Sequence, residues 1–326
     1  MSFLRILGND MGRYILKRIL QLIPVVIVVS FLIFIVMDMA SGDVVSALSG
    51  DMTLAEQELL RSQLGYDRGV LYRFWVYFKG LLHGDLGTSL VMGESVWKLY
   101  ISRFPNTLVL AFASCVVCYA LSLPLGIVSA IKQGSLVDNG CTVLALLGLS
   151  IPNFWLGLML IIAFSLKLKW FPSMDFKGFS SIILPAFTIG TGMMAQLTRT
   201  TRSSMVDVIR QDYLRMLRAK GVPENTVITK HAFKNALIPI ITIAGQQFAE
   251  TLGGAVLTET VFTWPGVGRL TISAINSRDT VLATGCILLT TVFHCLVILL
   301  VDILYAYIDP RIKGQYVKGK RKGSGK

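Results

Sequence analysis

Long apolar segments alternate with polar stretches along this chain of 326 residues. A transmembrane helix needs about 20 consecutive apolar residues. Six segments have that length and character: residues 19–37, 106–130, 141–166, 182–198, 237–257 and 283–307. The pattern therefore predicts an all-α integral membrane protein with six transmembrane helices and both termini on one side of the membrane.

Two of these segments need comment. The first could instead be a cleaved signal peptide, but the apolar core of a signal peptide is about 7–15 residues long and precedes a small-x-small cleavage site. The segment at 19–37 is longer and has no clean site of that kind, which favours an uncleaved helix. The third contains Pro152, and we expect its helix to continue, since neighbouring helices can satisfy the carbonyl that proline frees.

The mixed stretch at 38–105 predicts short helices outside the membrane. Thr53 and Glu56 have the spacing of a capping box, which opens a helix that Gly65 closes. The next helix carries five aromatic residues that suit a membrane interface better than a ligand cage: Tyr72, Phe74, Trp75, Tyr77 and Phe78. After a glycine-rich turn at 84–87, a third short helix leads back to the membrane.

Residues 212–239 form a basic, amphipathic stretch between two apolar segments. A helix that starts at Asp212 should break at Gly221 and restart at Pro223, because proline is well suited to the first turn. Four apolar side chains can then face one groove: Leu214, Leu217, Val227 and Ile228. The pattern alone allows two interpretations, a helix-turn-helix that docks a partner or a basic loop at an anionic leaflet.

Composition and charge support the membrane assignment. The chain is 53% hydrophobic and 15% charged, with a mean hydropathy of +0.64. Of the 31 Lys and Arg residues, 20 lie in the segments that are cytoplasmic if the N-terminus is inside, and 11 lie in the outer segments. Basic residues favour the cytoplasmic side. The net charge of +12 thus reflects membrane topology and does not indicate nucleic-acid binding.

The sequence offers no candidate for catalysis or for cofactor binding. It has no G-x-x-x-x-G-K-[ST] phosphate loop, no H-E-x-x-H and no G-x-S-x-G. Three scattered histidines build no metal site, and five cysteines in or beside apolar segments predict free thiols. Cys115 and Cys118 form C-x-x-C in an apolar helix, where packing is favoured over redox or zinc chemistry. We therefore expect a non-catalytic chain.

Polar residues inside the predicted spans are the remaining candidates. They are Gln196 in the fourth span and Gln246, Gln247, Glu250 and Thr251 in the fifth. An ionised carboxylate at mid-bilayer costs about 2.5–3.5 kcal/mol on insertion scales, so Glu250 should face a cavity or a partner. These residues could line a translocation path, or they could hydrogen-bond between helices. Close packing explains Gly190 and Gly192 in the fourth span as well as a path would.

Several motifs resemble one family. The run RAKG at 218–221, followed by HAFKNALIP, resembles the EAA loop of ABC-importer permeases, in the variant typical of dipeptide, oligopeptide and nickel permeases. The runs SIPNFWLGL, ETVFTWPGVGRL and LGYDRGVLYRFWVYFKGLLHGDLGTSL are also similar to that family. The chain departs from the general pattern in lacking a glutamate beside Ala219. It also has Ser41 where the family usually has proline before Gly42 and Asp43.

The resemblance implies a type I ABC permease fold in the cytoplasmic membrane. Its cytoplasmic coupling helix would dock on an ATPase subunit through six residues: Leu217, Ala219, Gly221, Val222, His231 and Asn235. It implies a second homologous permease, two ATPase subunits that bind ATP and magnesium, and an extracytoplasmic substrate-binding protein. Residues 1–105 would then hold the tail, first helix and extracytoplasmic segment, residues 106–311 the permease core, and residues 312–326 a basic cytoplasmic tail.

The implied function is import of di- or oligopeptides. Nickel or a metal chelate is the alternative substrate, which the absence of histidines along the predicted path disfavours. Two other classes stay open, a secondary transporter and a membrane scaffold. Transporters of the first class have internal repeats, and none is evident here. The outer segment at 38–105 is small for a receptor or scaffold.

Overall fold

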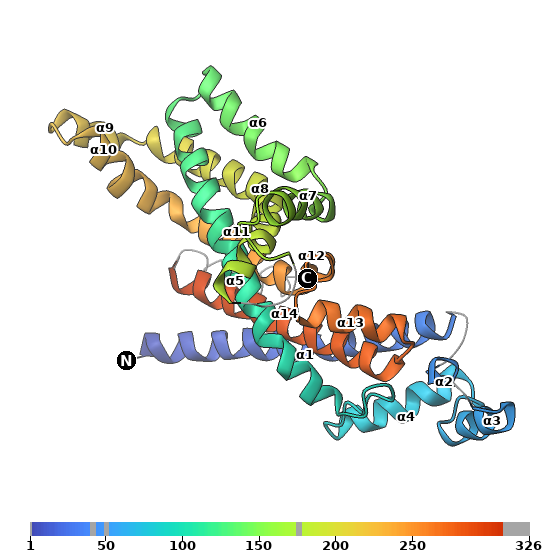
Figure 1. The fold of residues 1–326 in the computed structure, drawn as a ribbon. Coiled ribbons are helices and arrows are strands. Elements are labelled where there is room, and N and C mark those ends of the chain that lie inside the picture. Colours follow the sequence, from blue (N-terminus) through green and yellow to red (C-terminus); the bar gives the residue numbers. More distant parts are fainter. Residues whose placement is uncertain (1, 40–43, 49–51, 174–177, 309–326) are drawn as a thin grey trace. The chain divides into compact units, whose positions relative to one another are not determined.

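The computed structural model describes residues 2–39, 44–48, 52–173 and 178–308, and these residues are almost entirely helical (Figure 1). They contain no strand, only an isolated bridge between Thr88 and Ser95. The chain divides into two compact units. Unit 1 comprises Met1–Leu108 and Thr263–Cys295, and unit 2 comprises Val109–Phe262 and Leu296–Lys326. The basic tail expected at 312–326 lies outside the described residues.

Unit 1 contains a long N-terminal helix and several short ones. They are α1 (Ser2–Met39), α2 (Val44–Leu48), α3 (Leu54–Gln63), α4 (Val70–Leu82) and α13 (Val267–Asn276). The capping box at Thr53 is confirmed, since the Thr53 N–H donates to the Glu56 carboxylate at 2.7 Å and the Glu56 N–H donates back to Thr53 Oγ1. Gly65 ends this helix in the left-handed region, with φ of 73°, as its place in the sequence predicts.

Aromatic side chains join α1 to α4 in unit 1. Phe34 packs edge-on against Phe74 at 5.7 Å between ring centroids and lies 5.2 Å from the Tyr77 ring. Such pairs add about 0.5–1.5 kcal/mol beyond the burial of their area. The aromatic residues of α4 thus divide between two environments, because Tyr77 is buried while Trp75 is half exposed.

Two long helices belong partly to each unit: α5 (Val96–Ile131) and α14 (Thr280–Ile308). We expected a short helix near Val96 and a separate span from Asn106. The helix instead runs unbroken through Pro105 and Pro124. In unit 1 its first turns form a core in which Val96 and Tyr100 are fully buried. Gly285 of α14 approaches there so closely that a Cβ would meet Val96 at 2.4 Å.

Unit 2 is built around α8 (Ile183–Ile209) and α11 (Phe233–Gly254), with the shorter helices packed on them. The others are α6 (Leu136–Ser150), α7 (Asn153–Leu160), α9 (Asp212–Ala219), α10 (Glu224–Thr226) and α12 (Val256–Val261). Two π-helical segments, η1 (Ile161–Lys167) and η3 (Val227–Ala232), and one 3-10 turn, η2 (Phe179–Ile182), complete the set. Because η3 leads directly into α11, the second half of the predicted helix-turn-helix continues into the fifth apolar segment.

The third apolar segment is broken, contrary to the continuous helix that we expected. α6 and the α7–η1 helix meet at an angle of 94°. Ile151 ends α6 with extended backbone, φ −89° and ψ 121°, and Pro152 caps α7. A proline ring disfavours helical backbone at the residue before it. Here that preference ends the helix.

Among the described helices, four are long and apolar enough to cross a membrane, or five if the bent pair α6 and α7–η1 counts as one span. The four are Ile19–Met39, Val96–Ile131, Phe179–Ile209 and Thr280–Ile303. α11, a 22-residue helix, covers the fifth predicted segment as far as Gly254, but it is not among the four by length and apolar composition. The helices and several apolar spans are therefore confirmed, whereas a total of six transmembrane helices stays a prediction.

An ion pair joins three elements at one end of unit 2. The Asp138 carboxylate, at the start of α6, accepts from Arg202 Nε at 2.8 Å and from Nη2 at 2.7 Å. It also accepts from the Ser129 hydroxyl of α5 and from the Gly134 N–H. A buried pair is stable only when its remaining hydrogen bonds are satisfied, and here four donors serve one carboxylate.

Candidate functional site

The basic stretch forms a pair of helices, α9 and α10, which lie side by side at the end of unit 2 (Figure 1). α9 starts at Asp212, whose charge suits a helix N-terminus. It ends at Gly221, which has φ of 77°. The N–H groups of Gly221 and Val222 donate to the carbonyls of Arg218 and Leu217 at 2.9 and 3.2 Å. This is a Schellman motif, which satisfies carbonyls at the helix end. The break at Gly221 and the restart after Pro223 are as the sequence predicts.

An ion pair closes the turn between the two helices. Arg218 Nε and Nη2 donate to the two oxygens of Glu224 at 3.0 and 2.8 Å. The hydrogen bonds from Arg218 hold the pKa of the Glu224 carboxyl below its usual value, and burial opposes that shift. The pair is partly exposed, with 34% and 59% of the two side chains accessible. Its contribution to stability is therefore about 0–1 kcal/mol, and its main effect is to fix the angle of the turn.

The apolar face of the helix pair is covered by the chain itself. Leu214 and Val227 are fully buried, and Ile228 is 6% exposed. All three belong to one cluster with Met205 of α8, and Leu217 packs against it from the side. The groove that we expected these four residues to face is thus the core of unit 2. Tyr213 adds a polar tie, because its hydroxyl accepts from Asn235 Nδ2 at 2.7 Å.

The six predicted docking residues occupy two environments. Ala219, Gly221 and Asn235 are exposed. Leu217, Val222 and His231 are half-buried, and the first two pack against the internal core. Only the exposed three, with the edges of the others, offer area to another molecule.

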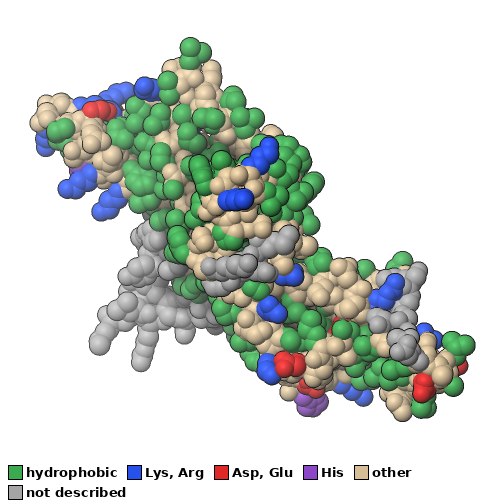
Figure 2. All heavy atoms as spheres, in the orientation of Figure 1, with side chains coloured by type: hydrophobic (Ala, Val, Ile, Leu, Met, Phe, Trp, Pro, Cys, Tyr) green, Lys and Arg blue, Asp and Glu red, His purple; other side chains and the backbone are tan. Residues whose placement is uncertain are grey.

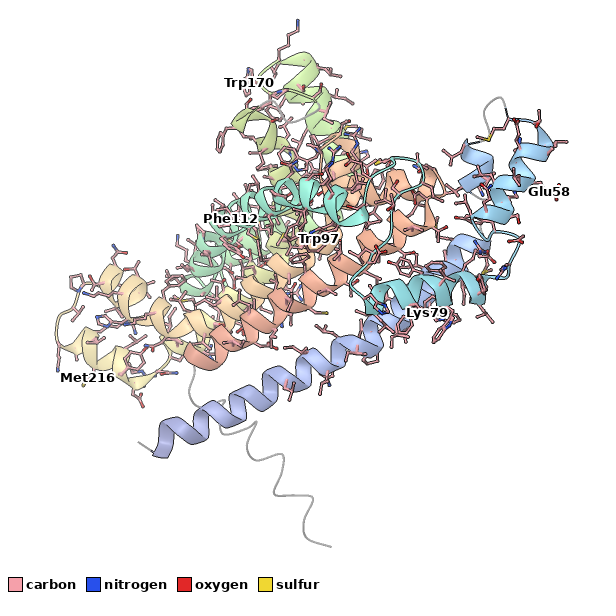
Figure 3. All side chains as sticks on the ribbon, turned by 90° about the horizontal axis from the view of Figure 1, so that it is seen from below. Glu58, Lys79, Trp97, Phe112, Trp170 and Met216 are labelled. Carbon is pink, nitrogen blue, oxygen red and sulfur yellow. The ribbon has the colours of Figure 1, made fainter. Side chains whose placement is uncertain are left out.

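The outer surface of α9 has one feature that we did not anticipate. Met216 is 52% exposed on a helix whose two leucines, Leu214 and Leu217, face inward, and it lies at the outer edge of the pair in Figure 3. Lys and Arg side chains surround this end of unit 2 in Figure 2. Position 216 follows Asp212 by four residues, so both share one helix face; that spacing was the signal available in the sequence. A single exposed apolar side chain is common on protein surfaces, so Met216 is a candidate contact only through its place among the predicted docking residues.

The polar residues of α11 also separate into two groups. Gln247 and Thr251 are buried, at 2% and 5% exposure, and they hold α11 to its neighbours. Gln247 Nε2 donates to the Met193 carbonyl of α8 at 2.8 Å, and the Cys118 thiol of α5 lies 3.8 Å from Gln247 Oε1. Thr251 donates to Met193 Sδ at 3.4 Å. For these two residues the contacts are those of interhelical hydrogen bonding.

Gln246 and Glu250 lie on a different face of α11, and both side chains are exposed in the isolated chain. They lie four residues apart and therefore on one face of α11. Asn235 and Pro239, also exposed, extend the same face toward the basic helix pair. Gln196 is exposed on α8. The chain thus presents a polar helix face that it does not cover itself, which is a candidate for contact with a path or a partner.

Gly190 and Gly192 are explained by close packing. A Cβ at Gly190 would lie 2.7 Å from the Ser114 carbonyl oxygen, and one at Gly192 would lie 2.6 Å from Asn153 Oδ1. All five cysteines are free thiols, as predicted. The described residues hold no group of His, Cys, Asp or Glu suited to a metal ion.

Comparison with known proteins identifies similar chains over nearly the whole length. Residues 122–314 match the family described as binding-protein-dependent transport system inner membrane component, and residues 11–111 match the N-terminal part described for the same kind of protein. The oligopeptide transport system permease protein AppB of Bacillus subtilis is 39% identical over 315 residues, covering 93% of this chain and all of AppB. The glutathione transport system permease protein GsiC of Escherichia coli K12 is 39% identical over 304 residues, covering 93% of this chain and 99% of GsiC.

Solved structures share the fold. Two inward-facing structures of the MetNI methionine ABC transporter match with TM-scores of 0.55 and 0.52 at 17% and 16% identity. Each match covers 65% of this chain, and 96% and 97% of the chain compared.

Proposed function

This chain belongs to the family of binding-protein-dependent transport system inner membrane components, and from that premise we propose that it is the permease subunit of an ATP-driven importer of short peptides. The observation that carries the proposal is the full-length similarity to AppB and GsiC, whose names give an oligopeptide and glutathione as substrates. Both substrates contain peptide bonds, which favours peptides over nickel or a metal chelate. ATP and magnesium would be bound by partner chains, since this sequence has no phosphate loop.

The substrate proposal is tested by uptake into liposomes that contain the assembled importer. We expect di-, tri- or oligopeptides to be accumulated in the presence of ATP, and free nickel ions to be left outside. Accumulation of nickel with no peptide uptake would replace the proposal by its metal alternative. Uptake driven by an ion gradient without ATP would place the chain among secondary transporters. If the complex assembled but no substrate were taken up, the scaffold alternative would be favoured.

The proposed partners are a second permease, two ATPase subunits and an extracytoplasmic binding protein. The helix pair α9–α10 is the proposed coupling element, with Ala219, Gly221 and Asn235 at its surface and Leu217, Val222 and His231 supporting them. Met216, which is exposed on the same helix, joins this set. ATP-driven closure of the ATPase subunits would move the pair. Movement would be transmitted to α11 because η3 joins the two without a loop, and ATP acts only insofar as it favours one conformation.

Co-purification tests the coupling element. Met216→Glu places a charge on the exposed apolar position and should reduce recovery of ATPase subunits with the affinity-purified permease. Met52→Glu is the control, because Met52 is also exposed, at 40%, and lies in unit 1. Equal recovery for both variants would mean that Met216 is no docking contact.

The translocation path is proposed to include Gln246 and Glu250, with Gln196 as a weaker member. Gln247 and Thr251 lie on the buried face and would support the path from behind. We expect Glu250→Gln to leave assembly intact and to change the transport rate or substrate preference. Gln247→Leu, by contrast, should lower the yield of folded chain, because the Met193 carbonyl loses its donor. If instead Glu250→Gln lowered the yield and Gln247→Leu changed only transport, the face with Gln247 would line the path and the face with Glu250 would hold the helices together.

The proposed topology has six spans with both termini inside. It is tested with single cysteines, Ser62→Cys and Ser324→Cys, in a chain whose five native cysteines have been removed. An impermeant maleimide added to intact cells should label position 62 and spare position 324. Labelling of position 324 from outside would overturn the topology.

A further inference from the structure

Unit 1 contains a pocket of about 480 Å³, which lies within the range of about 300–1,000 Å³ common for small-molecule sites. It is formed where the end of α1, the α3–α4 turn, α4 and the start of α14 come together. The side chains that matter chemically are Phe34, Tyr66, Arg68, Arg73, Tyr77 and Asp85. Neither the coupling element nor the polar face of α11 contributes to it.

The pocket lies beside the ends of two helices that are long and apolar enough to cross a membrane. Phe34 belongs to the last turns of the apolar helix Ile19–Met39, and Thr280 is the first residue of the apolar helix Thr280–Ile303. Both therefore mark points where a membrane-spanning helix ends, whichever side that is. Beside the pocket, α4 exposes Leu71 and Trp75, at 66% and 52%. Exposed apolar and aromatic side chains at such a level are typical of the lipid interface.

Two donors in the pocket have no partner within the described chain. The Tyr77 side chain is 9% exposed, and its hydroxyl makes no hydrogen bond. Arg73 Nε is also buried and unpartnered, although the Nη2 group of the same side chain pairs with Asp38. A buried polar group without a partner costs about 1–3 kcal/mol. Both donors thus favour a ligand rich in acceptor oxygens.

Charged groups at the rim define the ligand further. The Arg68 guanidinium is held 4.4 Å from the centre of the Tyr72 ring, a geometry that leaves its N–H groups available to an oxyanion. Asp85 lines the same pocket, and one of its oxygens accepts from the Gly87 N–H at 2.8 Å. An arginine and a carboxylate in one pocket match a ligand that carries both a negative and a positive group.

We propose that this pocket binds the head group of a zwitterionic phospholipid, with its phosphate toward Arg68, Arg73 Nε and Tyr77 and its primary ammonium toward Asp85. The acyl chains would lie along the exposed apolar side chains of α4. Arginine suits phosphate because its planar fork can donate two parallel hydrogen bonds. The site is independent of the transported substrate and of ATPase attachment.

Native mass spectrometry of the full-length chain in mild detergent tests the site. The probes are dilauroyl phosphatidylethanolamine, dilauroyl phosphatidylglycerol and inorganic phosphate. We expect one tightly retained phosphatidylethanolamine per chain, with about tenfold weaker retention in Arg68→Gln and in Tyr77→Phe, the loss expected for one hydrogen bond to a charged group. Lys79→Gln is the matched control, because Lys79 lies 5.6 Å from the Trp75 ring on the same helix and does not line the pocket; it is labelled in Figure 3.

Three results would overturn the proposal. Equal retention in the wild type and in Arg68→Gln, Tyr77→Phe and Lys79→Gln would assign the lipid to the general apolar surface. Binding of inorganic phosphate as tight as that of phosphatidylethanolamine would make the site one for free anions. If the wild type retained phosphatidylglycerol as tightly as phosphatidylethanolamine, and Asp85→Asn changed neither, the site would have no preference for a zwitterionic head group. All of these experiments measure bound lipid, so their outcome does not depend on whether the proposed transport function is correct.

Discussion

Two helix-turn-helix segments of this chain are built on the same turn and differ in what lies beneath it. α3 ends at Gly65 and α9 ends at Gly221, both glycines in the left-handed region with φ of 73° and 77°. Each turn has the paired hydrogen bonds of a Schellman motif, and the bond that spans more residues runs from the Tyr66 N–H to the Arg61 carbonyl in one and from the Val222 N–H to the Leu217 carbonyl in the other. The local signal in the sequence is therefore the same.

The surroundings of the two turns set them apart. α9 rests on a filled core, in which Leu214 is fully buried, and an arginine–glutamate pair closes the turn. α3 has no buried residue, and the turn after it borders a pocket. A filled core makes a segment stiff enough to transmit movement, whereas an open pocket leaves room for a ligand. The local sequence determines the geometry of the turn, whereas packing against distant residues determines whether a filled core or a pocket lies beside it.

The strongest test of this contrast is the removal of one leucine from each segment. Leu214→Ala should lower the free energy of unfolding by about 2–5 kcal/mol, because it leaves a cavity in the core of unit 2. Leu59→Ala on α3 should change it by less than about 0.5 kcal/mol, because Leu59 is 61% exposed. Unfolding of the purified variants in mixed micelles measures both. Similar losses would mean that the two segments are packed alike.

A second test changes the two glycines. Gly221→Asp should retain the fold, since nothing lies within 4 Å of the added Cβ and the left-handed backbone costs about 1–2 kcal/mol. It should weaken ATPase attachment about tenfold or more, the equivalent of about 1.4 kcal/mol, and uncouple ATP hydrolysis from uptake. The assay is a pull-down of ATPase subunits combined with substrate-stimulated hydrolysis in liposomes.

Gly65→Asp is the matched control for that experiment. Gly65 has the same backbone region and the same open space, so it carries the same strain without touching the coupling element. The amount of ATPase subunits recovered with Gly65→Asp should equal that recovered with the wild type. If Gly221→Asp also stays there, the basic stretch is a loop at the membrane surface and the coupling proposal is wrong.

The smallest effect is expected from the ion pair across the second turn. Glu224→Gln should cost less than about 1 kcal/mol, because the pair is partly exposed. The pKa of Glu224 is lowered in the folded chain, so the pair contributes fully above the ordinary value of 4.5 and its contribution is lost as the pH falls through the lowered pKa. Unfolding at neutral and acidic pH should show the gap between wild type and variant closing in acid. Glu58→Gln on α3, with an exposed side chain, serves as the control.

Much of the local structure could be predicted because it depends on neighbours in the sequence. The capping box at Thr53 and the turn at Gly221 involve residues within a few positions of one another. The break at Pro152 was missed because proline both breaks helices and is tolerated in membranes, and only the packing of α6 and α7 decides between these outcomes. The division of Gln246 and Glu250 from Gln247 and Thr251 was missed for a related reason. Helical spacing separates the two faces, but it does not tell which face meets Met193.

The π-helical segment η3 has a consequence for evolutionary insertions and deletions. A π-turn contains one residue more than the α-turn that it replaces, and one residue corresponds to a rotation of about 100° around an α-helix. Val227–Ala232 therefore sets the angular phase between the basic helix pair and the polar face of α11. Deletion of one residue there would convert the segment to a more common geometry without any loss of helix, yet it would rotate the basic helix pair by about 100° relative to α11. The exposed residues Thr229 and Lys230 can therefore change without altering this phase, whereas the buried Val227, Ile228 and Ala232 and the length of the segment cannot.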